Sequence, residues 1–189
     1  MKKPVQKSRI PEDKSFLIRE LKAPFFDVNW HFHSEYQLFV VLKGKGTRFI
    51  GNHMSSFKEG DMVLTGPNLP HLWRNDQEYF QIDSKLETHG IVIYFPDHFL
   101  QNAVFELNEF TSIANMLYKS SRGLEVQGKT NREITQMMKE LLKMEGVQSL
   151  IQLLTILEKI AQSEEYQIIA DAAYTNTFKE SERQNGISL

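Results

Sequence analysis

The chain has 189 residues, of which 41% are hydrophobic and 24% charged, with a formal net charge of −2 at pH 7 and no cysteine. This size suits one domain, or one domain with an appendage, and the charge argues against a surface built mainly to bind nucleic acid. The lack of cysteine excludes disulfides, thiol catalysis and a cysteine-ligated zinc. The N-terminus lacks the apolar core of a secretory signal and no run approaches the ~18 apolar residues of a membrane span, so we expect a cytoplasmic protein without membrane contact.

The first half of the chain has the pattern of a β protein. Residues 1–14 are charged and proline-punctuated, and we expect them to be a flexible lead-in. From residue 15 to residue 96, short β-branched and aromatic runs alternate with turns that contain glycine or proline. Their spacing of ~8–12 residues predicts a sandwich or barrel of roughly ten strands.

Residues 30–44 are the most informative stretch of this region. His31 and His33 precede an apolar run that ends at a Gly-Lys-Gly turn, where glycine permits positive φ. If the stretch is one strand, its side chains alternate, so His31, His33 and Gln37 share a face. An apolar run on both faces indicates a strand buried on both sides. We therefore expect these polar groups at the mouth of an apolar interior.

The hydrophobic period becomes helical after Pro96. Apolar spacing predicts a helix that ends near Gly123, a second helix that begins at an S/T-x-x-E capping box over 130–133, and a third over 147–161. After Ser163 the period is lost. The expected parts are a lead-in over 1–14, a barrel over 15–96, a helical region over 97–163 and a linker or tail over 164–189.

Two motifs suggest where the site lies. The pattern His-x-His-x(3)-Gln-x(6)-Gly over residues 31–44 is the first cupin motif, with Gln in the place of the usual Glu. The run from Gly60 to Asn75 resembles the second cupin motif and contributes His71. The resemblance implies a mainly β protein: a cupin-like double-stranded β-helix (jelly-roll) barrel, followed by a helical hairpin or bundle. It also implies convergence of His31, His33, Gln37 and His71.

This side-chain set admits a metal. Three imidazoles suit Zn, Ni, Cu or Fe, and a fourth ligand would be an oxygen, although the amide of Gln37 is a weaker donor than a carboxylate. The alternative is that the histidines are hydrogen-bonded groups at the edge of a pocket. We expect no obligatory cofactor, and a divalent metal such as zinc or nickel held by His31, His33, His71 and Gln37 is the one candidate.

Four segments in order resemble the N-terminal domain of AraC-family bacterial transcription regulators. They are residues 30–33, 44–51, 57–61 and 66–73, and the likeness extends over about residues 10–170. The resemblance implies an effector-sensing and dimerising domain, which in the family precedes two helix-turn-helix units. No such unit occurs here, so DNA contact is expected only through a further domain, whether the sequence is one part of a regulator or a protein that has lost this domain.

The leading hypothesis is therefore a sensor that is not an enzyme and has no catalytic residue. It would bind a small molecule, a sugar by analogy with the family, and pass its occupancy to a DNA-binding domain. The predicted ligand-binding residues are Trp30, His31, His33, Gln37, Arg48, His71 and Trp73. The alternatives are a metal-dependent cupin enzyme, such as an isomerase or dioxygenase using His31, His33 and His71, and a dimerisation module with a vestigial pocket.

The third helix carries the prediction of a homodimer. Its apolar face is wider than packing on one side requires, and monomers avoid exposing such a patch. Part of it must cover the barrel, and the rest would meet a second copy across a two-fold axis. The predicted interface residues are Leu150, Ile151, Leu154, Leu157 and Ile160. The alternative is a helix packed between the barrel and the preceding helix and fully used within the monomer.

Overall fold

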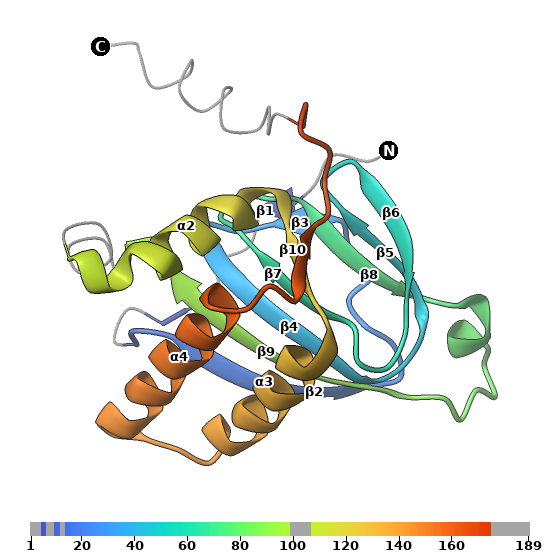
Figure 1. Cartoon of the computed structure of the whole chain (residues 1–189). Coiled ribbons are helices and arrows are strands. Elements are labelled where there is room, and N and C mark those ends of the chain that lie inside the picture. Colours follow the sequence, from blue (N-terminus) through green and yellow to red (C-terminus); the bar gives the residue numbers. More distant parts are fainter. Residues whose placement is uncertain (1–4, 7–9, 12–13, 99–106, 175–189) are drawn as a thin grey trace, which may run out of the picture.

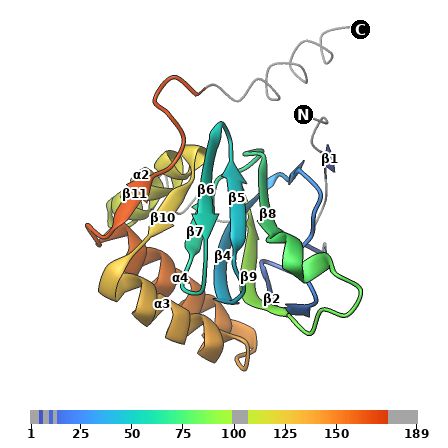
Figure 2. The same ribbon diagram turned by 90° about the vertical axis from the view of Figure 1, so that its right-hand side faces the viewer.

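The computed structural model describes residues 5–6, 10–11, 14–98 and 107–174. Within these ranges the strands form two facing sheets, and α-helices gather against the outer face of one of them (Figures 1 and 2). Most of the predicted lead-in, the last part of the predicted tail and residues 99–106 lie outside the described residues. No helix of the described part has the length and hydropathy of a membrane span.

The strands belong to two sheets of different size. The five-stranded sheet has the order β1 (Val5–Gln6), β3 (His31–Phe32), β8 (His71–Asn75), β5 (Gly46–Ile50) and β6 (His53–Phe57). The six-stranded sheet has the order β11 (Tyr166–Ile168), β10 (Leu124–Val126), β7 (Met62–Thr65), β4 (Glu35–Lys43), β9 (Thr88–Pro96) and β2 (Leu17–Ala23). The pairing is antiparallel except between β1 and β3. The predicted cupin-like barrel with a helical appendage is confirmed.

The stretch that we treated as one strand is two strands in different sheets. His31 and Phe32 belong to β3 in the five-stranded sheet, whereas β4 begins at Glu35 in the six-stranded sheet. The chain crosses between the sheets at residues 33–34. Within β4 the alternation is as expected, since Phe39 packs in the core between the sheets and Leu38 in the core beneath the helices.

In the described part of the chain, the α-helices that follow the barrel strands are α2 (Thr111–Lys119), α3 (Gly128–Leu141) and α4 (Gly146–Ala161). Short 3₁₀ turns lie at Gln77–Phe80 (η1), Asn108–Phe110 (η2) and Ser120–Arg122 (η3). The α-helices pack with β4, β7, β9 and β10 around one apolar core, while a second core fills the space between the sheets. The six-stranded sheet is therefore covered on both faces.

The predicted capping box at 130–133 is wrong. Helix α3 begins at Gly128, and its first turn is capped by Glu165, which comes from beyond α4. The carboxylate of Glu165 accepts the backbone N–H groups of Lys129 at 3.1 Å and Thr130 at 2.7 Å. These bonds lower the pKa of Glu165 and place a negative charge at the positive end of the helix dipole.

The segment after α4 is not only a linker. Residues 166–168, which we expected in the tail, form β11 and pair with β10. Beyond β11, the guanidinium of Arg122 donates hydrogen bonds to the carbonyls of Ala170 and Asp171, and Asn52 donates one to the Asp171 side chain. These contacts hold the chain against the barrel as far as the described residues extend.

Helix α4 uses much of its apolar face inside the monomer. Leu157 and Ile160 are fully buried in the core beneath the helices, together with Leu153 and Ile156. Leu157 and Ile160 therefore cannot meet a second copy, which corrects two of the predicted interface residues. Leu150 and Leu154 are half-buried and Ile151 is 49% exposed, so these three remain on the outer side of the helix.

Candidate functional site

A pocket of about 200 Å³ lies between the two sheets. Its walls are mostly apolar and come from β2, β3, β4, β8, β9 and the loop after β2. The apolar lining residues are Leu21, Ala23, Phe25, Phe26, Phe39, Trp73, Val92 and Tyr94. The polar lining residues are Arg19, Asp27, His31, Gln37 and His71. A few convergent polar groups in an apolar cavity are the usual make-up of a small-molecule site.

The structure brings His31, His33 and His71 together, and of these His31 and His71 line the pocket whereas His33 does not. The β3–β8 ladder places His31 opposite His71, with ring centroids 4.6 Å apart, and the ring of His33 lies 4.9 Å from that of His71. All three side chains are buried, and one nitrogen of each lies within 4.8 Å of the others. The three imidazoles therefore form one cluster.

Each ring of the cluster is oriented by a backbone carbonyl two residues away. The Nδ1 atoms of His31, His33 and His71 lie 2.7, 2.9 and 2.7 Å from the carbonyl oxygens of Asn29, Glu35 and Leu69. Since a carbonyl only accepts, Nδ1 carries the proton and donates it, and a neutral ring then keeps its lone pair on Nε2. Metal-binding histidines are commonly held in this way. The donor set therefore fits a divalent metal held by three Nε2 atoms.

Gln37 competes with such a metal for one of these nitrogens. Its Oε1 atom lies 3.2 Å from Nε2 of His33. In this orientation His33 donates from both nitrogens, as an imidazolium does, whereas turning the amide by 180° lets its NH₂ group donate to a neutral ring. In both arrangements the Nε2 atom of His33 is used within the protein. A metal at the cluster would have to displace this contact.

Two residues next to His33 were not among the predicted site residues. Glu35 is buried, and its carboxylate lies 3.5 Å from Nδ1 of His33. The ring of Tyr94 lies 5.3 Å from that of His33 and lines the pocket. Glu35 shares its odd-numbered face with Gln37, so the alternation within β4 could have identified it. Tyr94 gave no such signal, because its pairing with β4 is a long-range contact.

Arg48 and Trp30, like His33, do not line the pocket, which corrects three of the predicted ligand contacts. Arg48 is buried and bonded to other side chains, namely the carboxylates of Asp61 and Glu125 and, at 3.0 Å, the hydroxyl of Ser55. Trp30 is half-buried and packs edge-to-face on Phe49, with ring centroids 6.4 Å apart. Trp30 precedes His31 directly, and neighbouring residues of an extended chain point to opposite faces.

Trp73, one of the predicted ligand-binding residues, lies in the pocket wall. Its ring packs edge-to-face on Phe39, and its indole N–H donates a hydrogen bond of 2.9 Å to Asp61. Burial raises the pKa of Asp61 to about 6, although the nearby Arg48 and the bond from Trp73 both lower it. An ionisable group with a raised pKa therefore stands directly behind the pocket wall.

Comparison with known proteins identifies the fold. Residues 21–79 match the cupin domain family. A segment of 49 residues is 39% identical to an uncharacterised protein of Aquifex aeolicus (strain VF5), and this match covers 25% of the chain and 40% of that protein. The chain therefore spans less than half of that relative.

Two solved structures resemble most of the chain. Fatty acid-bound wild-type ToxT from Vibrio cholerae strain SCE256 has a TM-score of 0.54 at 16% identity, over 96% of this chain and 67% of that chain. The AraC-like transcriptional activator CuxR has a TM-score of 0.50 at 10% identity, over 82% of this chain and 54% of that chain. At these identities the likeness concerns the fold alone. Residues 21–79 thus match the model of the cupin domain family, and the chain shares its fold with ToxT and the AraC-like activator CuxR.

Proposed function

We propose that this chain is the ligand-sensing part of a cytoplasmic AraC-type transcription regulator. A small molecule would bind in the pocket between the sheets, and the helical region would pass its occupancy to a DNA-binding domain. The observation that carries the proposal is the apolar pocket with a few convergent polar groups, in a fold shared with an AraC-like activator. On this view the division into barrel, helical region and linker is the one that the sequence predicts, except that residues 166–168 form β11 of the six-stranded sheet.

The pocket favours a small organic acid over a sugar. Its walls are aromatic and aliphatic, with Arg19 among the lining residues on β2 and His31 and His71 among those on β3 and β8. The Oδ1 atom of the lining Asp27 already accepts hydrogen bonds from Asn29. A sugar would leave most of its hydroxyls facing apolar side chains, which costs free energy. ToxT supports this choice, because two of its structures hold an unsaturated fatty acid and (E)-4-(8-methylnaphthalen-1-yl)but-3-enoic acid.

A thermal-shift and calorimetry series tests this function. The probes are octanoate and cinnamate, their alcohols octanol and cinnamyl alcohol, and D-glucose. We expect the acids to bind more tightly than the alcohols, and D-glucose to give no shift. Because a charge-assisted bond is lost, Arg19→Gln should reduce the preference for acid over alcohol by about tenfold.

The control for this series is Lys22→Gln, which removes an exposed cation of the same strand that pairs with Glu20 and does not line the pocket. It should leave the preference for acids unchanged. A series in which D-glucose binds and neither acid does would contradict the proposed ligand class. Binding of none of the five probes would contradict the small-molecule pocket itself.

A second candidate function is a metal-dependent cupin enzyme. The observation in its favour is the common orientation of the three rings by backbone carbonyls. A bound divalent metal would polarise an oxygen of a substrate. Chelation followed by calorimetric titration with zinc and nickel separates the two functions. The sensor predicts that the metal-free protein binds octanoate unchanged, whereas the enzyme predicts tight metal binding that is lost in His71→Ala.

A further inference from the structure

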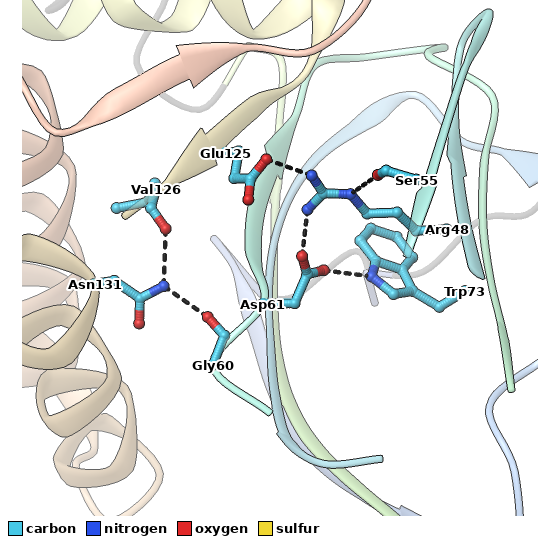
Figure 3. Close-up of polar contacts among 8 residues, drawn as sticks. All are labelled: Arg48, Ser55, Gly60, Asp61, Trp73, Glu125, Val126 and Asn131. Atoms are coloured by element: carbon cyan, nitrogen blue, oxygen red, sulfur yellow. Dashed lines mark hydrogen bonds and ion pairs between the residues drawn. The ribbon is translucent and has the colours of Figure 1, made fainter. Parts of the chain in front are cut away.

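A chain of polar contacts joins the pocket wall to the helical layer (Figure 3). The indole N–H of Trp73 donates to one carboxylate oxygen of Asp61, and Arg48 pairs with the other oxygen. The second terminal nitrogen of Arg48 pairs with Glu125. The contacts therefore run from a residue that lines the pocket to a residue of β10, the strand that leads into α3.

The turn before β7 is also bonded directly to α3. The side-chain amide of Asn131 donates hydrogen bonds of 2.8 Å to the carbonyls of Gly60 and Val126 (Figure 3). On its other side this turn is fixed to β4, since Gly60 donates to the carbonyl of Val41 and the carbonyl of Asp61 accepts from Val41. Residues 60–61 thus contact the pocket wall, β4 and the first turns of α3 at once.

Burial makes these contacts depend on one another. Only 3% of the Arg48 side chain and 6% of the Asp61 side chain are exposed, whereas Glu125 is 30% exposed. In a site of low dielectric, each charge is stabilised mainly by its partners, so a change at one member is felt by the others. Because β10 pairs with β7 through Glu125 and Val63, a shift of Asp61 also has a short backbone route to the same strand.

We propose that Asp61 is a positioning residue that couples Trp73 in the pocket wall to β10 and the N-terminal turns of α3. A bound molecule that moves the indole of Trp73 would weaken its bond to Asp61 and shift the balance of the Arg48 pairs. This role in signalling rests on the proposed function. The coupling itself is a property of the ligand-free chain and can be measured without a ligand.

Hydrogen exchange in the ligand-free chain tests the coupling. Trp73→Phe keeps an aromatic ring in the wall but removes the N–H that Asp61 accepts. We expect backbone exchange over residues 124–131 to become at least about threefold faster, while exchange in β2 and β9 stays the same. The matched control is Trp30→Phe, because Trp30 packs on Phe49 outside these contacts. Unchanged exchange over 124–131, or an equal effect of Trp30→Phe, would overturn the proposal.

The reverse experiment changes Glu125 and measures Trp73, because a coupling between two sites is reciprocal. In the Trp30→Phe background, Trp73 is the single tryptophan of the chain. Glu125→Gln should change its emission wavelength and its quenching by acrylamide, and should have no further effect once Asp61→Asn is present. The control is Glu133→Gln on α3, which removes an ion pair with Lys159 of α4. The proposal would be overturned if Trp73 fluorescence did not change in Glu125→Gln, or if it changed equally in Glu133→Gln.

A third experiment, hydrogen exchange with octanoate present, distinguishes a failure of the coupling from a failure of the proposed ligand class. If octanoate binds and Trp73 couples the pocket to β10, exchange over 124–131 changes on binding, and Asp61→Asn removes that change. If octanoate binds without such a change, the signalling role is wrong. If octanoate does not bind, the proposed ligand fails, and the two ligand-free experiments still decide the coupling.

Discussion

His31 and His71 lie directly opposite each other across the β3–β8 ladder, with ring centroids 4.6 Å apart. Each comes from one of the two cupin-like motifs, and the Nδ1 atom of each donates a hydrogen bond to a backbone carbonyl. The pairing explains why a cluster forms from motifs that are distant in the sequence. It also fixes the direction of both rings before any ligand arrives, which lowers the entropic cost of binding one.

Gln37→Glu should strengthen metal binding at the cluster. The substitution replaces a neutral amide oxygen next to Nε2 of His33 with a charged carboxylate oxygen, which is a better ligand for zinc. We expect the zinc dissociation constant to fall by about tenfold or more, measured by competition with a chelator of known affinity. Gln37→Met, which offers no oxygen, is the control. Tight zinc binding by the unmodified chain that Gln37→Glu does not improve would count against the sensor.

Asp61 should make stability depend on pH. Burial raises its pKa from 3.8 to about 6, so the folded chain holds a proton that the unfolded chain releases between these values. The resulting stabilisation is present below about pH 4 and is lost as the pH rises through about 6. Between low pH and pH 7, a shift of this size lowers the free energy of unfolding by roughly 3 kcal/mol, at 1.36 kcal/mol per pKa unit.

The measurement is urea unfolding of the unmodified chain and of Asp61→Asn at several pH values from 4 to 7. The free energy of unfolding of the unmodified chain should rise relative to that of Asp61→Asn as the pH falls. Asp83→Asn, at an exposed position outside the network, is the control for the loss of one carboxyl group. Parallel curves for the unmodified chain and Asp61→Asn would contradict a raised pKa.

The outer side of α4 should carry the contact between two copies. Val147 is 71% exposed and Ile151 is 49% exposed, next to the half-buried Leu150 and Leu154. We expect a dimer at micromolar concentration that Ile151→Glu weakens by at least about tenfold, because it places a charge in an apolar contact. Sedimentation measures the association, with Gln136→Glu on α3 as the charge-matched control. A strictly monomeric unmodified chain would refute the dimer.

The inner side of the same helix should matter for stability instead. Leu157 and Ile160 are fully buried in the monomer, so Leu157→Ala should lower the free energy of unfolding by about 2–5 kcal/mol. Ile151→Ala should lower it much less. Denaturant unfolding of both variants gives the comparison. Equal losses would mean that the helix is not packed as described, and weaker association in Leu157→Ala at full stability would restore Leu157 to the interface.

Local sequence patterns were enough to predict the barrel, the helical region and the cluster of three histidines. Alternation within residues 35–43 gave the correct faces for Phe39 and Leu38, and helical spacing gave α4 within a residue. Such patterns predict side-chain direction but not which segments meet. The partners of Arg48, namely Asp61 in the turn before β7 and Glu125 on β10, lie elsewhere in the sequence, so the pattern within β5 could not show that this side chain was already bonded.

Short elements also escaped prediction. Strands β10 and β11 have three residues each, too few for a period to be recognised. The crossing between the sheets at residues 33–34 has no turn signal of glycine or proline. The cap of α3 comes from Glu165, whose position beside the helix depends on the return of the chain through α4.

That cap has a mechanical consequence. Glu165 binds the first turn of α3 through its carboxylate, and its backbone carbonyl accepts the N–H of Gln127 at 2.8 Å. These hydrogen bonds join the two ends of residues 127–165, the stretch that contains α3 and α4, and the two helices pack together within it. A displacement of Asn131 would therefore act next to the hydrogen bonds that Glu165 makes to the first turn of α3. The two helices are therefore expected to tilt together as one body rather than bend separately.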